Sequence, residues 1–227
     1  MVRVKVCGVT NVPDLEAVER AGADAIGVIA DVPVDTPRAV SLETAEELFD
    51  AAPPFLTTTL VTMAESIDEA TGTADAVDPD VLQLHTDLPP ESLRSIGEST
   101  AGKLIAVVDA ADPDRARAVA PAVDGILVDS IDESGAGGTG ETHDWDATSE
   151  VAATLDIPVI LAGGLTPDNV AAAVETVRPF AVDVATGVER SGGRKDHDAV
   201  RSFVANAVDA TESDGSGHSR KRGEAQP

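Results

Sequence analysis

Two glycine-containing stretches of this sequence have the residue types that bind a phosphate group. Gly163 and Gly164 follow the apolar run "VILA", and Thr186 and Gly187 follow "AVDVA", each near an expected helix start. Glycine lets the backbone approach an anion, and N–H groups at a helix N-terminus donate hydrogen bonds to it. The two stretches therefore predict one phosphate site, although "LAGGLTPDN" is also a sequence typical of a tight turn into a helix.

Other polar residues stand at or just beyond the ends of apolar runs. They are Cys7 in "VKVC", Arg38 in "TPR", His85 in "VLQLH", Asp129 in "GILVD" and Asp183 in "AVDVA". Each has a structural alternative: a buried cysteine can serve as a small hydrophobe, and an aspartate can cap a turn. Arginine can be an ordinary surface residue and histidine a core residue, so these types leave chemistry and packing both open.

Two common kinds of catalytic site lack support. The four histidines (His85, His143, His197 and His218) form no HxxxH or HxH pattern, and one cysteine makes no zinc cluster. The nucleophile elbow G-x-S-x-G does not occur. We therefore expect neither a metal ion nor a Ser–His–Asp triad.

The elements that must position these residues alternate between strands and helices. Most of the expected strands are nearly continuous apolar, β-branched runs, as is typical of parallel strands buried on both faces. They are Val2–Val6, Ala25–Ala30, Phe55–Thr62, Val81–His85, Lys103–Val108, Gly125–Asp129, Pro158–Ala162 and Phe180–Ala185. The expected helices are Val12–Ala21, Leu42–Ala51, Ile67–Ala74, Pro90–Ser99, Pro113–Ala120, Asp146–Leu155, Pro167–Val177 and Asp198–Val208. The helix at Ile67 has the weakest pattern, because turn formers follow it.

This alternation predicts an α/β fold, a single (β/α)8 TIM barrel. An open doubly wound sheet usually has fewer strands, and its dinucleotide-binding form carries an early G-x-G-x-x-G that is absent here. We expect the barrel to span residues 1–210 and the polar stretch 211–227 to be a disordered tail. In such a barrel the strand ends, and the polar residues on them, meet at one rim.

The charge balance is strongly acidic. Asp and Glu number 41 against 16 Lys and Arg, which gives a formal net charge of −25. The acids alternate with apolar segments, so we interpret them as a solvated surface, as in proteins of salt-accumulating microbes. Such a surface repels phosphate backbones, and nucleic acid is not an expected partner.

The sequence also indicates a compartment. One cysteine excludes an internal disulfide framework, and no window approaches the ~20 apolar residues of a membrane helix. The N-terminus lacks a signal-peptide pattern. We expect a cytoplasmic protein, a monomer or homodimer, with no membrane partner.

Eight pieces of the sequence, taken together and in order, resemble phosphoribosylanthranilate isomerase, an enzyme family of tryptophan biosynthesis. The pieces are "KVCGVTN", "AGADAIGVI", "TPRAVS", "VLQLH", "ILVDS", "GGTGETHDW", "LAGGLTPDNV" and "DVATGVE…GGRKD". The resemblance runs from the N-terminus to residue 196, nearly the whole chain before the tail. Each piece is short, but eight of them at barrel spacing are specific.

The resemblance implies an Amadori rearrangement of an aminoaldose phosphate to 1-(2-carboxyphenylamino)-1-deoxyribulose 5-phosphate. An acid protonates the ribose ring oxygen to open the ring to a Schiff base, and a base then removes the proton from the sugar C2. Carried over by position, Asp129 is the acid and Cys7 is the base. No cofactor is implied, because the protonated imine is the electron sink.

The resemblance also implies how the phosphorylated substrate is bound. Arg38 would hold the anthranilate carboxylate with its two-pronged guanidinium, and Asp183 would contact the sugar hydroxyls, with His85 a further rim residue. The phosphate ligands would be Gly163, Gly164, Thr186 and Gly187. Lys5 would either assist Cys7 or form a structural ion pair inside the barrel.

Two departures and several alternatives stand beside this interpretation. The family often has aromatic residues where this chain has "VIADVPVD", and two serines where it has Ala185 and Thr186. Indole-glycerol-phosphate synthase would need strand lysines that match poorly here. The histidine-pathway isomerase would use aspartates in both halves and bind two phosphates. A non-catalytic barrel that binds a phosphorylated metabolite, or one enzyme serving both pathways, are the remaining alternatives.

Overall fold

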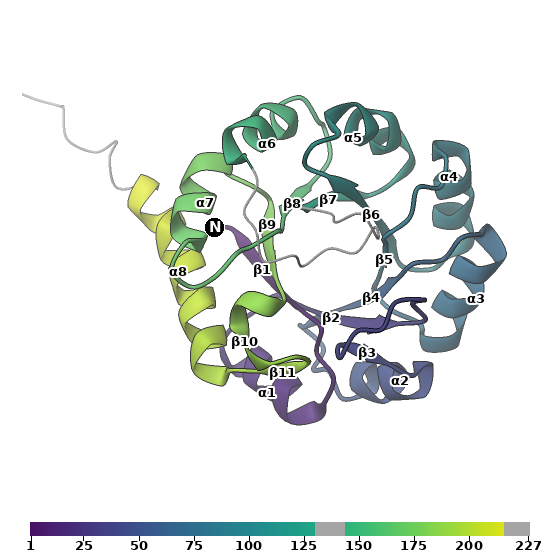
Figure 1. Cartoon of the computed structure of the whole chain (residues 1–227), viewed down its shortest axis with the longest axis horizontal. Helices are drawn as coiled ribbons and strands as arrows, with labels where there is room; N and C mark the ends of the chain where they lie inside the picture. Colours follow the sequence, from purple (N-terminus) through teal and green to yellow (C-terminus); the bar gives the residue numbers. More distant parts are fainter. Residues whose placement is uncertain (130–143, 216–227) are drawn as a thin grey trace, which may run out of the picture.

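Eight parallel strands close into a barrel because the first strand pairs with both the second and the last. The computed structural model describes residues 1–129 and 144–215. The barrel strands are β1 (Arg3–Cys7), β2 (Ala25–Ala30), β4 (Thr57–Thr62), β5 (Val81–Leu84), β6 (Lys103–Asp109), β7 (Gly125–Asp129), β8 (Val159–Leu161) and β9 (Ala181–Val184). Around the ring their order is β1-β9-β8-β7-β6-β5-β4-β2, with β3 (Ala39–Val40) beside β2 (Figure 1). The predicted TIM barrel is confirmed.

The helices form a layer outside the strands (Figure 1). They are α1 (Val12–Arg20), α2 (Leu42–Asp50), α3 (Ile67–Val77), α4 (Pro90–Ser99), α5 (Pro113–Val119), α6 (Trp145–Ala152), α7 (Val170–Val177) and α8 (His197–Gly215). Short 3-10 turns, η1 (Ala120–Ala122) and η2 (Thr186–Val188), follow α5 and β9. Each predicted helix is present, with boundaries that differ by a few residues at most ends.

Packing and a side-chain turn explain two of the boundary differences. Helix α3 continues to Val77 because its buried face, with Ala74 and Val77, packs into the core. Helix α7 begins three residues later than predicted, since Asn169 closes a turn instead. Its side chain accepts from the N–H of Thr166 and donates to the carbonyl of Gly164.

The barrel buries two apolar layers. The larger lies between the strands and the surrounding helices. The smaller fills the barrel interior and consists of Val107, Leu127, Ile160, Ala162 and Ala181. The interior is therefore packed, as in other barrels, and the space for a ligand lies at its end.

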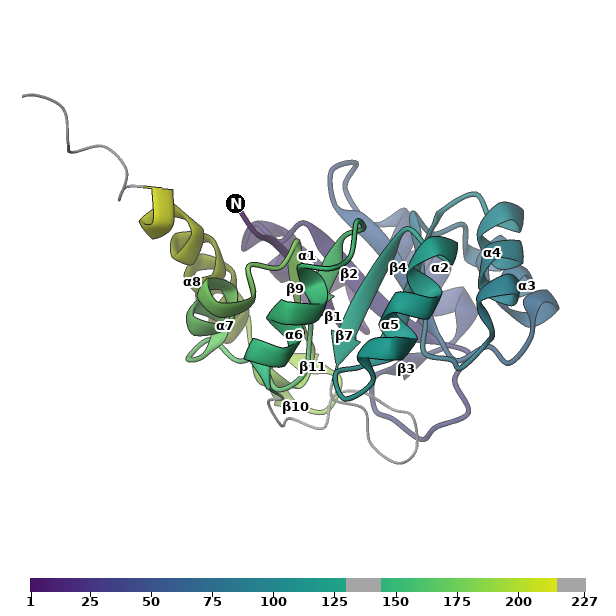
Figure 2. The same ribbon diagram turned by 90° about the horizontal axis from the view of Figure 1, so that it is seen from above.

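A hairpin that the sequence did not predict stands at that end of the barrel. Strands β10 (Glu189–Ser191) and β11 (Arg194–Lys195) pair antiparallel, and Glu189 lies opposite Lys195. Figure 2 shows this hairpin and β3 at one end of the barrel and the N-terminus towards the other.

The end of the chain is helical for longer than expected. Helix α8 runs to Gly215, so the stretch 211–215 is helix where a disordered tail was expected. Residues 216–227, and residues 130–143 with most of the "GGTGETHDW" piece, lie outside the described part of the chain. Among the described residues, no helix combines the length and apolar character that crossing a membrane requires.

Candidate active site

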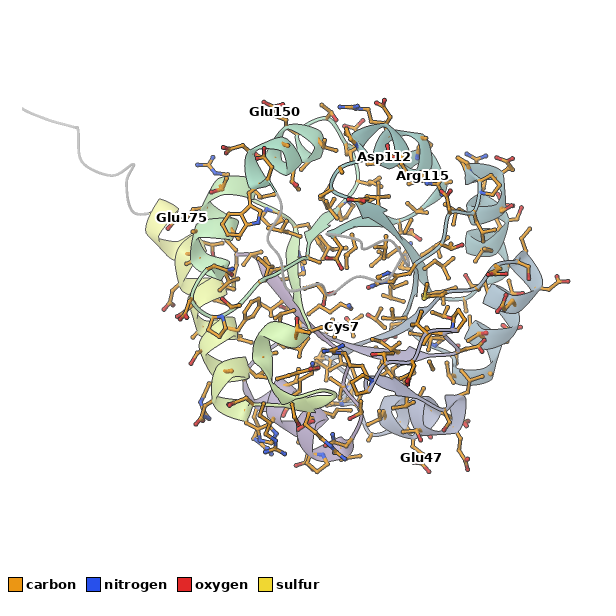
Figure 3. All side chains as sticks on the ribbon, viewed as in Figure 1. Cys7, Glu47, Asp112, Arg115, Glu150 and Glu175 are labelled. Atoms are coloured by element: carbon orange, nitrogen blue, oxygen red, sulfur yellow. The ribbon has the colours of Figure 1, made fainter. Side chains whose placement is uncertain are left out.

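A cavity open to solvent lies at the end of the barrel where the strands run out, with about 850 Å³ of empty space when the adjoining open solvent is included. Its lining includes eight of the nine residues predicted from the sequence: Cys7, Arg38, His85, Asp129, Gly163, Gly164, Asp183 and Thr186. An apolar wall completes it, formed by Ile29, Val32, Val34, Val61 and Met63. Figure 3 shows Cys7 near the centre of the ring, whereas labelled charged residues such as Glu47 and Glu175 point outward from the helices.

Cys7 is buried at the end of β1 and faces a glycine on the next strand. Gly27 is its register partner, and a Cβ atom at Gly27 would come within 2.8 Å of the Cys7 sulfur. The same atom would lie 3.1 Å from Nζ of Lys5. Thiol and ammonium therefore share the space that Gly27 leaves, a role that sequence reasoning missed because it depends on strand register.

Three charges act on the Cys7 thiol. Burial raises its pKa above the ordinary value, and the carboxylate of Asp183 raises it further. The ammonium groups of Lys5 and Lys195 lower the pKa but do not outweigh burial. With its pKa raised, the thiol of Cys7 is mainly protonated at neutral pH. When the thiolate forms, the ammonium groups of Lys5 and Lys195 supply positive charge beside it.

Lys5 forms an ion pair inside the barrel. Nζ of Lys5 lies 3.0 Å from Oδ2 of Asp183, and both side chains are less than a tenth exposed. Burial lowers the pKa of Lys5, but the charges of Asp183 and Cys7 raise it by more, so the lysine stays charged. The other oxygen, Oδ1 of Asp183, is buried and accepts no hydrogen bond from the described residues. The ion-pair alternative for Lys5 is present in the structure, and the lysine also stands beside Cys7; its assistance to Cys7 stays a prediction.

Asp129 ends β7 and is buried at the cavity. Strands β8 and β9 separate β7 from β1 in the ring, so Asp129 and Cys7 reach the cavity from different strands around its wall. This arrangement allows two side chains to act on different atoms of one bound molecule.

His85 and Gln83 form a neutral polar patch on β5 and the residue after it. Burial, assisted by the charge of Lys5, lowers the pKa of His85 to about 4, so its imidazole is neutral at physiological pH. Nε2 of Gln83 lies 3.2 Å from Nε2 of His85, and Oε1 of Gln83 is buried without a hydrogen bond from the described residues. The pair can hydrogen-bond a polar group without adding charge.

The predicted phosphate ligands lie on two neighbouring loops. Gly163 and Gly164 adopt left-handed φ angles of 83° and 62°, which glycine adopts without strain. Thr186 begins η2 after β9 and lines the same cavity. Gly187 is not among the lining residues; a Cβ there would overlap the carbonyl oxygen of Leu165, so this glycine lets the two loops pack together. A phosphate contact from Gly187 stays a prediction.

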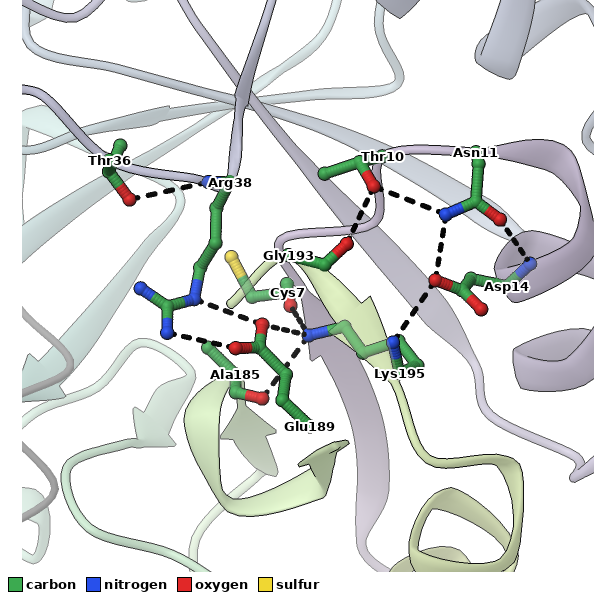
Figure 4. A network of polar contacts seen from close by, with 10 residues as sticks. All are labelled: Cys7, Thr10, Asn11, Asp14, Thr36, Arg38, Ala185, Glu189, Gly193 and Lys195. Carbon is green, nitrogen blue, oxygen red and sulfur yellow. Dashed lines mark hydrogen bonds and ion pairs between the residues drawn. The ribbon is translucent and has the colours of Figure 1, made fainter. Parts of the chain in front are cut away.

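Arg38 is held by Glu189, which in turn pairs with Lys195, and neither Glu189 nor Lys195 was predicted to have a role. Its Nε and Nη2 each donate to Glu189 at 2.9 Å, and Lys195 lies 3.0 Å from the same carboxylate (Figure 4). Both residues belong to pieces that carried the family resemblance, "GVE" and "GGRKD". Membership of these pieces was the one feature of the sequence that could have pointed to Glu189 and Lys195, but it did not indicate which residues they contact.

The donor set gives little scope for a metal ion. Within 1–129 and 144–215, no group of three or more His, Cys, Asp and Glu side chains is arranged to hold one. The cavity brings together a thiol and a carboxyl group, types that can transfer protons, with an arginine and glycine-rich loops, types that can bind an anion.

Comparisons with known proteins agree with this geometry. The family model of N-(5'-phosphoribosyl)anthranilate (PRA) isomerase matches residues 4–206. A protein of that name from Haloferax volcanii is 64% identical over 210 residues, covering 92% of this chain and 95% of the relative. The Haloarcula marismortui protein of that name is 52% identical over 93% of this chain and 99% of its own.

Solved structures agree as well. A crystal structure of phosphoribosyl anthranilate isomerase in complex with reduced 1-(o-carboxyphenylamino)-1-deoxyribulose 5-phosphate matches with a TM-score of 0.80 at 34% identity. It covers 92% of this chain and all of its own. A monomeric form of the dimeric Thermotoga maritima enzyme gives a TM-score of 0.80 at 32% identity, with the same coverage.

Proposed function

This chain belongs to the family of N-(5'-phosphoribosyl)anthranilate isomerases, and on that premise we propose that Asp129 and Cys7 perform the two proton transfers of the reaction. The chain is an isomerase of tryptophan biosynthesis. What remains to be assigned is the role of each residue in the cavity.

Asp129 is proposed as the general acid. Its carboxyl group donates a proton to the ribose ring oxygen as the C1–O bond breaks, and the nitrogen lone pair forms the protonated imine. Asp129 is buried and lines the cavity, and this step needs its carboxyl group in the protonated form. The resulting Asp129 carboxylate then stabilises the positive imine nearby.

Cys7 is proposed as the general base. Its thiolate removes the proton from the sugar C2, and the electron pair of that C–H bond moves towards the imine nitrogen. The enolamine that results tautomerises to the ketone. Lys5, which shares the space beside Gly27 with the sulfur, stabilises the thiolate against the cost of burial.

The remaining residues are proposed to bind the substrate. Arg38 holds the anthranilate carboxylate, the apolar wall packs against its ring, and Oδ1 of Asp183 accepts from a sugar hydroxyl. His85 contributes at the rim as a neutral group. The loops bearing Gly163, Gly164, Thr186 and Gly187 hold the phosphate, with backbone N–H groups and the threonine hydroxyl replacing a serine.

One observation carries this assignment: a thiol and a carboxyl group from different strands, an arginine and the two glycine loops line the same cavity. The test is turnover of freshly made N-(5'-phosphoribosyl)anthranilate, followed by anthranilate fluorescence in molar salt. We expect Cys7→Ser and Asp129→Asn each to lower kcat by about 10²–10⁴-fold, while circular dichroism stays unchanged. Wild-type turnover by either variant would remove that residue from its role.

We also propose that the protein works in the cytoplasm as a monomer or homodimer without nucleic acid or a membrane. A net charge of −25 opposes nucleic acid, and a reducing compartment keeps a single thiol active. We propose that the barrel is the single folded domain of the chain and that the polar tail follows it. Light scattering at molar salt tests the oligomeric state.

A further inference from the structure

The hairpin of β10 and β11 buries a lysine whose three protons are all used. Lys195 has no exposed side-chain surface, and its ammonium donates to the carbonyls of Cys7 and Ala185 and to the carboxylate of Glu189. These three acceptors belong to the end of β1, the segment after β9 and the hairpin itself. Lys195 therefore ties the backbone of the proposed base to the backbone beside the phosphate loop (Figure 4).

Glu189 fixes one edge of the Arg38 guanidinium. Its carboxylate, 4% exposed, accepts from Nε and Nη2 of Arg38 in a two-pronged contact with both distances 2.9 Å. A guanidinium has a second two-pronged edge, formed by Nη1 and Nη2. Because Arg38 also lines the cavity, the engaged first edge orients the guanidinium and leaves the second for a substrate carboxylate.

Close packing also surrounds Pro37 and the side chain of Arg38. At Gly8, with φ of 72°, a Cβ would lie 2.9 Å from Cδ of Arg38. At Gly192, a Cβ would lie 2.6 Å from Cγ of Pro37, and at Gly193 it would overlap the Pro37 carbonyl oxygen. The hairpin and the loop after β1 thus both pack directly against the Pro37–Arg38 segment.

The charges in this group explain why a lysine accompanies the glutamate. Arg38 and Glu189 alone would form a neutral pair, and the glutamate would repel a substrate carboxylate. Burial by itself would raise the pKa of Glu189, but the hydrogen bonds and charges of Arg38 and Lys195 together lower it, so Lys195 helps to balance the Glu189 charge. Burial lowers the pKa of Lys195, and the charge of Glu189 opposes that shift. With its ammonium protonated, the three side chains carry one net positive charge, and of the three only Arg38 lines the cavity.

We propose that Glu189, balanced by Lys195, is a positioning residue that sets the preference of this enzyme for a substrate with a carboxylate on its aromatic ring. The inference rests on the proposed role of Arg38. Glu189 touches no reacting atom; it acts by holding the guanidinium in the orientation that a carboxylate requires. A glutamate with a merely structural role would support turnover of substrates with and without the carboxylate equally.

The experiment compares two substrates: N-(5'-phosphoribosyl)anthranilate and the analogue in which aniline replaces anthranilate. For Glu189→Gln we expect KM for the first to rise about tenfold, the loss typical of a weakened charged contact. For the aniline analogue we expect kcat/KM within about threefold of wild type. The matched control is Glu16→Gln, which removes a glutamate from an exposed pair with Arg20, and it should change neither substrate.

Three further measurements make the outcome decisive. Glu189→Asp keeps the negative charge but has a shorter side chain, so it should also lower the preference for the carboxylated substrate. This variant tests the inference if Glu189→Gln does not fold. Lys195→Met should raise KM for the carboxylated substrate more than for the analogue. In an Arg38→Ala background, Glu189→Gln should no longer alter the preference.

Equal losses on both substrates in the folded variants would overturn the inference. Failure of the wild-type protein to turn over N-(5'-phosphoribosyl)anthranilate would instead contradict the assigned activity. An Arg38→Ala variant with the preference of the wild type would contradict the proposed role of Arg38. The three failures are therefore distinguishable.

Discussion

Two buried lysine–carboxylate pairs stand at the same end of this barrel and differ in how many of their oxygen atoms are engaged. In the pair of Lys5 and Asp183, one carboxylate oxygen accepts no hydrogen bond from the described residues, and Asp183 lines the cavity. In the pair of Lys195 and Glu189, both oxygens accept hydrogen bonds and neither residue lines the cavity. Each pair has an N···O distance of 3.0 Å.

The difference between the two pairs shows how one end of a barrel can place substrate-binding residues and positioning residues in separate ion pairs. Burying two charges costs roughly several kcal/mol per ion before their attraction is counted, so such pairs are weak contributors to stability. A pair with an unsatisfied oxygen at a cavity is suited to bind substrate and to influence a neighbouring thiol. A saturated pair is suited to hold other side chains in place.

The largest effect is expected from a substitution that breaks the pair of Lys5 and Asp183. Lys5→Met removes the ammonium beside Cys7 and leaves Asp183 without its partner, so the thiolate loses its main stabilising charge. We expect kcat to fall about 10²–10³-fold, as for the loss of one electrostatic contact in an active site. Steady-state kinetics in molar salt measure it. A kcat near that of wild type would show that Lys5 is only structural.

The next largest effect is expected from filling the space beside Gly27 that Lys5 shares with Cys7. Gly27→Ala places a methyl group within contact distance of the sulfur and displaces it, so kcat should fall roughly 10–10²-fold. The control is Gly72→Ala on α3, where a Cβ meets no atom within 4 Å. That control should retain full activity and gain up to about 1 kcal/mol in helix stability. Equal activities of the two variants would remove the steric role of Gly27.

A smaller effect is expected from Asp183→Asn. The substitution keeps an oxygen for a sugar hydroxyl but removes the charge, so KM should rise about tenfold. Because the carboxylate raises the pKa of Cys7, its neutralisation should lower that pKa, and kcat/KM should reach its plateau at a lower pH. A plateau at higher pH than in wild type would contradict the assigned electrostatics.

The smallest effect on activity and stability is expected from an ion pair that belongs to neither of the two buried pairs. Lys103 and Asp124 form an exposed ion pair at 2.8 Å. Molar salt shortens the Debye length to about 3 Å and screens such pairs. Lys103→Met should change neither kcat nor the melting temperature, and a measurable loss of activity would show that the lysine variants act through net charge.

Much of this arrangement was predictable from local sequence. Apolar runs that end at Cys7 and Asp129, or that contain Asp183 near their end, predicted the strands, and closure of the barrel then places those ends at one rim. The hairpin was missed because "ERSGGRK" has no apolar alternation to mark a strand. Gly27 was missed because its role follows from register between strands.

The support network was harder to predict for a physical reason. Glu189 lies 151 positions from Arg38, and Lys195 lies 188 from Cys7. A charged residue in a polar loop is usually solvated, and nothing local marks these two as buried. Only closure of the barrel, which brings β9 beside β1, places them against the site.

The central claim is that Cys7 is a base whose ionisation depends on the first pair, and alkylation of Cys7 by iodoacetamide as a function of pH tests it most directly. Cys7 is the one cysteine in the sequence, so labelling reports this thiol alone. The labelling midpoint in wild type should lie above that of a free cysteine, and it should coincide with the rise of kcat/KM. It should move up in Lys5→Met and down in Asp183→Asn. A midpoint that neither variant moves, or that differs from the kinetic one, would contradict the account.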